Sequence, residues 1–252
     1  MINYIKSELY RVFNSKALYL YILVCNVLMV LAAVTLFYFN QVDSHFPYGN
    51  AHFFYINVIS ASTLILIVGI AMNLLVNHKE NKLMNKISVS FDVSRSTIFW
   101  GKFLVYLISF SLLCIISTII TVILGLTLFE YDNVSLNQYL ISLINMAPLI
   151  LGGLALAHTL NSFKINIAIV IILTSLIYLQ SSHLFQLLAY LNHHFNHLYK
   201  LTPGERLNQN FENFMTHSST LDLNNWIIGG ILSLLFLFCG QVIFKKSEFN
   251  DE

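Results

Sequence analysis

Residues 103–129 read FLVYLISFSLLCIISTIITVILGLTLF and contain no Asp, Glu, Lys or Arg. A helix crosses the hydrocarbon core of a bilayer with about 20 apolar residues, and a charge at its centre costs roughly 2.5–3.5 kcal/mol on insertion scales. Five other intervals of at least 22 residues are equally free of charge: 17–42, 44–77, 133–163, 165–199 and 223–244.

This spacing of charges predicts an all-α membrane protein in which residues 1–252 form a single transmembrane domain. Six transmembrane helices are expected, at about 17–40, 53–77, 100–126, 138–160, 165–188 and 225–244. Hydrophobic residues make up 57% of the chain and charged residues 10%, against about 25% charged in soluble domains. The net charge of +1 indicates no polyanionic partner, which argues against nucleic acid.

The basic residues predict the orientation of these helices. Six spans place both termini on one side, and positive residues concentrate on the cytoplasmic side of a membrane. The opposite side has only Lys200 and Arg206. The side of the termini has all the others: Lys6, Arg11, Lys16, Lys79, Lys82, Lys86, Arg95, Lys102, Lys164, Lys245 and Lys246. Both termini and the connector between spans two and three are therefore expected in the cytoplasm.

Two segments outside the spans have helical patterns. In residues 1–16, apolar side chains recur at helical spacing, which predicts an amphipathic helix in the inner headgroup layer. Its other face would carry Asn3, Lys6, Glu8, Arg11 and Asn14. In the outer loop 189–224, Pro203 and Gly204 separate two short segments, for which we expect short helices dipping toward the outer interface.

Motifs for catalysis are missing from the sequence, so no catalytic residue is assigned. It has no GxxxxGK[ST] loop for nucleotide, no GxSxG, HExxH or SxxK motif, and no Asp or Glu inside a span. His193 and His197 have the spacing of zinc ligands, and His194 lies between them. No Cys or carboxylate stands near them in the sequence, so a polar interfacial cluster is favoured over a metal site.

Polar residues also occur inside the spans. Span five has a stripe at positions i, i+4, i+7 and i+8 of a helix, formed by Thr174, Tyr178, Ser181 and Ser182. Such a stripe lines a translocation path or a subunit seam, or it bonds neighbouring helices. The same choice applies to Asn26 in span one, where helix packing is favoured. Gly152 and Gly153, after Pro148, indicate a kink or a close approach of two helices.

The connector 78–98 has the pattern of a short amphipathic helix. Leu83, Met84, Ile87 and Phe91 share one face, and Lys82, Asn85 and Lys86 lie opposite. Such a helix rests on lipid headgroups or docks into a groove on a cytosolic protein.

The order of motifs resembles that of ABC-2-type ABC transporter permeases. The connector has Glu80 and Lys82, then ISVSFDVSRS with Ser94 and Arg95, then Gly101-Lys102 before span three. Residues 5–23 read IKSELYRVFNSKALYLYIL, which is similar to the opening of these permeases. One departure is NKLMN, which stands where the family often has a Gly-Thr pair. The chain is most similar to permeases of bacterial peptide exporters, including exporters of phenol-soluble modulins, and of lantibiotic or bacitracin immunity.

The resemblance implies a transport subunit in the bacterial cytoplasmic membrane, without enzymatic activity of its own. It would pair with a second copy or a homologue and with two ATPase subunits, which would hold the ATP and Mg. Residues 78–98 would form the coupling segment, with ATPase contacts from Glu80, Lys82, Leu83, Met84, Lys86, Ile87, Phe91 and Arg95. Spans one and five would border the path, and the cargo would be amphipathic peptides. A non-transporting assembly factor, sensor or immunity protein is the alternative, followed by an integral membrane enzyme.

Overall fold

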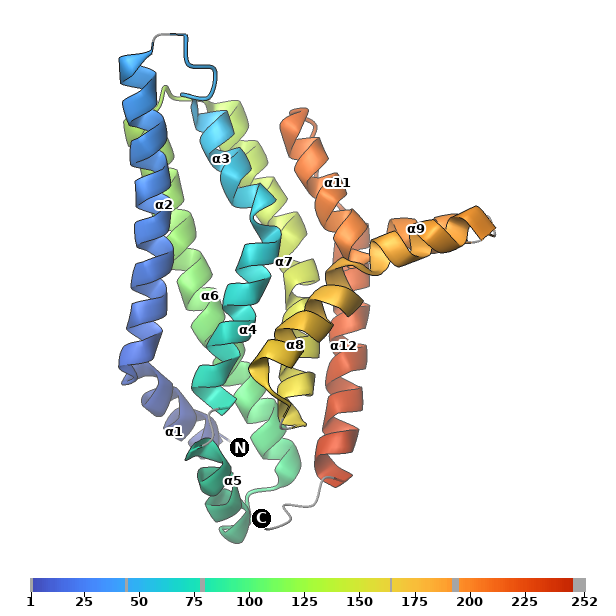
Figure 1. The fold of residues 1–252 in the computed structure, drawn as a ribbon. Helices are drawn as coiled ribbons and strands as arrows, with labels where there is room; N and C mark the ends of the chain where they lie inside the picture. Colours follow the sequence, from blue (N-terminus) through green and yellow to red (C-terminus); the bar gives the residue numbers. More distant parts are fainter. Residues whose placement is uncertain (1, 44, 78–79, 164, 192–194, 247–252) are drawn as a thin grey trace.

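The computed structural model describes residues 2–43, 45–77, 80–163, 165–191 and 195–246, with no strand among them (Figure 1). The prediction of an all-α fold is therefore confirmed. The helices are α1 (Ile2–Phe13), α2 (Lys16–Val42), α3 (Ala51–Ser60), α4 (Ser62–Asn77), α5 (Glu80–Ser90), α6 (Arg95–Leu128), α7 (Asn133–Ser162), α8 (Ile167–Thr174), the π-helix η1 (Ser175–Leu179), α9 (Ser181–Leu191), α10 (Phe195–Leu201), α11 (Pro203–Met215) and α12 (Leu223–Lys246).

Four of these helices are long and apolar enough to cross a membrane, namely α2, α6, α7 and α12. The number rises to six if each of two bent pairs is one span: α3 with α4, bent by 51°, and α8–η1 with α9, bent by 43°. In α7, 67% of the most apolar stretch is buried, against 11–22% in the other three long helices. The bundle is therefore built around α7.

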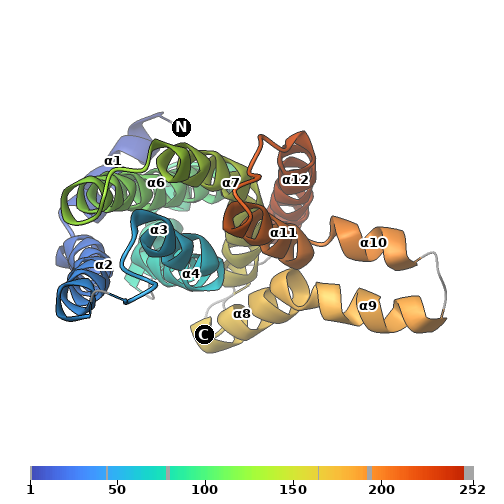
Figure 2. The same cartoon turned by 90° about the horizontal axis from the view of Figure 1, so that it is seen from above.

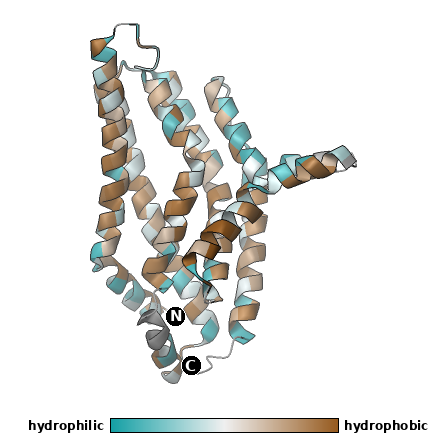
Figure 3. Cartoon of the chain, viewed as in Figure 1, coloured by the Kyte–Doolittle hydropathy of each residue, from teal (hydrophilic) through white to brown (hydrophobic). Residues whose placement is uncertain are grey.

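The outer surface of the bundle is apolar. Hydrophobic residues run along the long helices, and hydrophilic residues gather at their ends and on α11 (Figure 3). On α2, large apolar side chains are exposed over the length of the helix, among them Leu20, Leu23, Leu28, Leu31 and Val34. A surface of this extent is expected to face lipid rather than water.

The fifth span does not continue straight through the bundle. At its bend the Gln180 N–H bonds to the Ser175 carbonyl five residues earlier, at 3.0 Å, which is the π-helical pattern. Beyond the bend, α9 leaves the bundle sideways, and α10 returns beside it (Figures 1 and 2). The segment 165–188 is thus divided between a short piece packed on α7 and a helix that projects outward.

One end of the bundle collects α1, α5 and the terminal turns of α4, α6 and α12 (Figure 1). We call it the α5 end. The first helix packs across α6 and α4, and α5 contacts the end of α4. The segment that resembles a coupling loop and the amphipathic first helix therefore lie at the same end of the molecule.

Candidate functional site

The helix α5 presents apolar side chains on the surface of the α5 end. Ile87 is 42% exposed and Phe91, just after the helix, is 78% exposed, while Asn85 is buried. Lys86 is exposed on the same helix. The side chains of Glu80, Lys82, Leu83 and Met84 lie outside the described part of the structure. Among the described side chains, Ile87 and Phe91 thus provide an apolar surface at the tip of the molecule.

The turn from α5 into α6 is closed by hydrogen bonds. Asp92 has a φ of 60°, and the N–H of Val93 bonds to the Ser88 carbonyl at 3.0 Å, the pattern of a Schellman C-cap. Two residues later, the Ser94 hydroxyl accepts from the Thr97 N–H at 3.2 Å and caps α6. The end of α5 and the start of α6 are thus both capped, and only a short turn separates the two helices.

Arg95 connects the start of α6 with the end of α12. Its Nη1 donates to the Lys245 carbonyl at 3.0 Å, and Gln241 Nε2 donates to the Ser96 hydroxyl at 2.6 Å. A cation at a helix C-terminus satisfies unpaired carbonyls and complements the helix dipole. The resemblance assigned Arg95 to an ATPase contact, and in this chain its guanidinium lies against α12.

A second arginine connects α1 with the end of α4. Arg11 pairs with Glu8, and it donates to the carbonyls of Leu75 at 3.4 Å and Val76 at 3.5 Å. Lys102 of α6 is buried beside Glu8. Burial, together with the Glu8 carboxylate, raises the pKa of Tyr4. The last turn of α4, which leads into α5, is thus held by α1.

The prediction for the first helix was wrong at Glu8. We expected it on the polar face, yet it is only 7% exposed. It turns inward because Arg11 and Lys102 provide cations there, and a buried carboxylate requires such partners. The signal in the sequence was Lys102, a charge at the very edge of an apolar interval.

The residues of the predicted polar stripe of span five are buried or half-buried. Thr174 and Tyr178 are buried, as is Ser182, and Ser181 is half-buried. The Tyr178 hydroxyl donates to the Leu149 carbonyl of α7. The structure thus brings Tyr178, which lies in the π turn, to a seam with α7, while Thr174 ends α8 and the two serines begin α9.

The remaining predicted polar residues have separate positions. Asn26 is buried on α2, and its Nδ2 donates to Ile22 of the same helix at 2.7 Å. His197 is exposed on α10, whereas His193 and His194 lie outside the described residues. Over the described ranges, no group of three or more His, Cys, Asp or Glu residues has the arrangement to hold a metal ion.

The four to six spans define the class: this is a multi-span helical membrane protein. No protein-family model matches the chain, and a search of curated proteins finds no match.

Proposed function

We propose that this chain is the permease subunit of an ATP-driven ABC-2-type exporter that moves amphipathic peptides out of a bacterial cell. The observation that carries the proposal is α5, a short helix between two candidate spans at one end of the bundle (Figure 1), where Ile87 of the helix and Phe91 just after it are exposed. A helix with such a face fits a groove on a soluble partner.

The partner would be an ATPase subunit, because the chain has no nucleotide-binding loop of its own. The bias of Lys and Arg supports a cytoplasmic position for the α5 end, where ATP is available. Two ATPase subunits and a second permease copy or homologue complete the proposed exporter, with ATP and Mg held by the ATPases.

The contacts around α5 support a mechanical route into the membrane. Movement of the docked ATPase displaces α5, and the capped turn at Asp92 carries this displacement into α6. Arg95 transmits it to α12, and Arg11 couples the end of α4 to α1. Rigid-body tilting of packed helices is an established means of switching access.

The test of docking uses the full-length chain, co-expressed and purified with any P-loop ATPase that is encoded next to it. The double variant Ile87→Asp, Phe91→Asp is expected to lose the ATPase, because charges replace the apolar contact. Val134→Asp is the matched control, since Val134 is a 58% exposed apolar residue near the start of α7. Retained association in the double variant would show that this helix is not the docking element.

Transport is tested with the complex in vesicles and a fluorescent amphipathic peptide. ATP-dependent movement of the peptide is the expected result. Stable association with the ATPase but no ATP-dependent movement would favour the non-transporting alternative, an assembly, sensor or immunity protein.

A further inference from the structure

The helices α9 and α10 together form an arm that extends sideways from the bundle (Figures 1 and 2). The two helices pack against each other in antiparallel directions, and their other main contacts run to η1 and α11 at the root of the arm. Residues 181–201 carry a single charge, that of Lys200. The bundle therefore leaves the outer part of the arm uncovered.

The first helix of the arm has one apolar and one polar exposed side. Leu184 and Leu187 are 61% and 64% exposed, and Leu188 is also exposed. These positions, i, i+3 and i+4, share one side of a helix. The exposed residues of the other side are polar: His183, Gln186 and Tyr190. Phe185 and Ala189 are half-buried and form the side that the neighbouring helices cover.

The second helix of the arm repeats this division. Leu198 and Leu201 are exposed on one side, and His197 and Lys200 are exposed on another, while Tyr199 is half-buried. In both helices the leucines follow the half-buried side in the same rotational direction when the helix is viewed from its N-terminus. Because the helices are antiparallel, both sets of leucines then face the same side of the arm. We call this side the leucine face and the opposite side the polar face.

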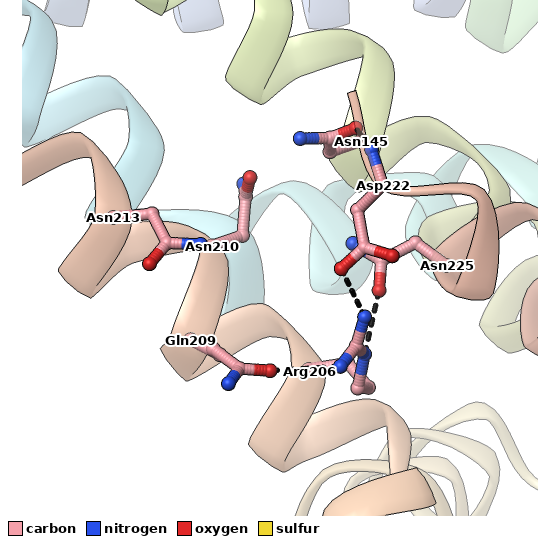
Figure 4. A pocket seen from close by; sticks show the side chains of 7 residues that line it. All are labelled: Asn145, Arg206, Gln209, Asn210, Asn213, Asp222 and Asn225. Atoms are coloured by element: carbon pink, nitrogen blue, oxygen red, sulfur yellow. Dashed lines mark hydrogen bonds and ion pairs between the residues drawn. The ribbon is translucent and has the colours of Figure 1, made fainter. Parts of the chain in front are cut away.

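The root of the arm lies where the surface of the bundle changes from apolar to polar. Gly204 of α11 lies against the Leu179 carbonyl of η1, and Arg206 donates through Nε to Asn225 Oδ1 near the start of α12 at 2.7 Å (Figure 4). Beyond this level α12 exposes apolar side chains: Ile227, Ile231, Leu234 and Leu235.

On the other side of the root, α11 exposes polar side chains: Asn208, Gln209 and Glu212 (Figure 3). Trp226 of α12 is half-exposed at the change from apolar to polar surface, and tryptophan is enriched at membrane–water interfaces. The boundary of the hydrocarbon therefore passes through the root of the arm.

We propose that the arm lies in the membrane leaflet opposite the α5 end, parallel to the membrane plane, with its leucine face in the acyl chains and its polar face among the headgroups. Lipid is the partner because the leucine face continues the exposed apolar surface of α8 and η1, formed by Ile169, Ile172 and Leu176. An amphipathic helix in this position buries its apolar side about 5–10 Å into the boundary of headgroups and acyl chains. Lys200 and Tyr190 on the polar face suit the headgroup layer.

The proposal reassigns the second half of the predicted span five. The bent pair of α8–η1 and α9 is either a broken span or a helix that turns back at the membrane surface. In the proposed arrangement the chain leaves the hydrocarbon at the π turn, and α9 runs along the interface instead of across the bilayer. This arrangement rests on the class of the protein, a multi-span membrane protein, and not on the proposed export function.

The experiment measures the depth of spin labels in the full-length chain in lipid nanodiscs. Depth follows from the ratio of collisions with oxygen, which concentrates in acyl chains, to collisions with a water-soluble nickel chelate. The three native cysteines are replaced with alanine, and the label is attached in the Leu184→Cys chain or, as the matched control on the polar face, in the Gln186→Cys chain. Since a helix with its side chains is about 10 Å across, the label at position 184 is expected to lie roughly 10 Å deeper than the label at position 186. The same order is expected for Leu198→Cys and His197→Cys on α10.

Three results would overturn the proposal. Free access of the nickel chelate to both positions of α9 would place the arm in water, and equal depth of both labels in the acyl chains would make α9 part of a transmembrane span. A label at position 184 that neither reagent reaches would show that protein, such as a second copy of the chain, covers the leucine face.

A second measurement uses the unsubstituted chain, so it remains decisive if the cysteine-free chain does not fold. A phospholipid with a diazirine in its acyl chain is activated by light in the nanodisc, and the modified residues are identified by mass. Modification of Leu184, Leu187 or Leu188 without modification of Gln186 is the expected result. Absence of modification on α9, or equal modification of both faces, would refute the placement of the leucine face in the acyl chains.

Discussion

Replacing Gly152 with alanine places a methyl group where the Tyr178 hydroxyl lies. A Cβ on Gly152 would be 2.4 Å from the Tyr178 hydroxyl oxygen, and 3.2 and 3.3 Å from two ring carbons. Because the optimal separation of such atoms is about 3.5–4.0 Å, the tyrosine has to move and lose its hydrogen bond to Leu149. Overpacking costs about 1–3 kcal/mol and the lost hydrogen bond about 0.5–1.5 kcal/mol.

The better helix propensity of alanine offsets about 1 kcal/mol of this cost, so Gly152→Ala is expected to lower the free energy of unfolding by roughly 1–3 kcal/mol. Tyr178→Phe alone costs about 0.5–1.5 kcal/mol. In the double variant the hydroxyl is absent, so the two effects should fall short of additivity by about 1–2 kcal/mol.

The assay is unfolding by SDS in mixed micelles, followed by tryptophan fluorescence, for the four chains of this cycle. Gly230→Ala is the control, because a Cβ there meets no described atom within 4 Å. It is expected to leave stability unchanged or to raise it slightly. Additive effects in the cycle, or equal stability of the Gly152→Ala and Gly230→Ala chains, would refute the close packing of span five on α7.

Two further predictions concern the connecting turns. The hydrogen bond from Ser135 lowers the pKa of Asp132, so the stabilisation from this carboxylate is present near neutral pH and is lost as the pH falls through that lowered value. Ser135→Ala should raise the pKa of Asp132 and move acid unfolding to higher pH, as measured by ¹³C carboxyl titration; an unchanged pKa would count against this bond. Asp92 has a φ of 60°, where glycine is unstrained, so Asp92→Gly should stabilise the chain by about 0.5–1 kcal/mol in the SDS assay, whereas Asp92→Val should destabilise it. Equal stability of these two variants would contradict the C-cap.

Local composition was sufficient to predict the helical membrane fold. The charge-free intervals correspond to α2, α6, α7, α12 and the two bent pairs, because the cost of a charge in hydrocarbon acts on each segment separately. Helix ends with a side-chain cap, such as Ser94 before α6, are likewise set by a few neighbouring residues.

The partners of individual polar side chains depended on segments far apart in the sequence. Glu8 has the position of a surface residue in the helical pattern of α1, and only the packing of α1 on α6 brings Lys102 beside it. Arg206 and Asp222 belong to one outer loop, and no spacing rule predicts that they pair with each other beside Asn225.

Span five is the clearest example of a feature that the composition of a segment does not predict. Its composition predicts one membrane helix, and the apolar run from Ile167 to Leu179 does form helix. Within the π turn at Ser175–Leu179, Tyr178 packs against α7 at Gly152, and beyond the turn α9 leaves the bundle sideways. The sequence by itself determined which segments are apolar enough to enter the bilayer, since that depends on each residue's own transfer free energy. Only the tertiary structure decided where a span bends and which polar groups meet, because those choices depend on contacts between helices.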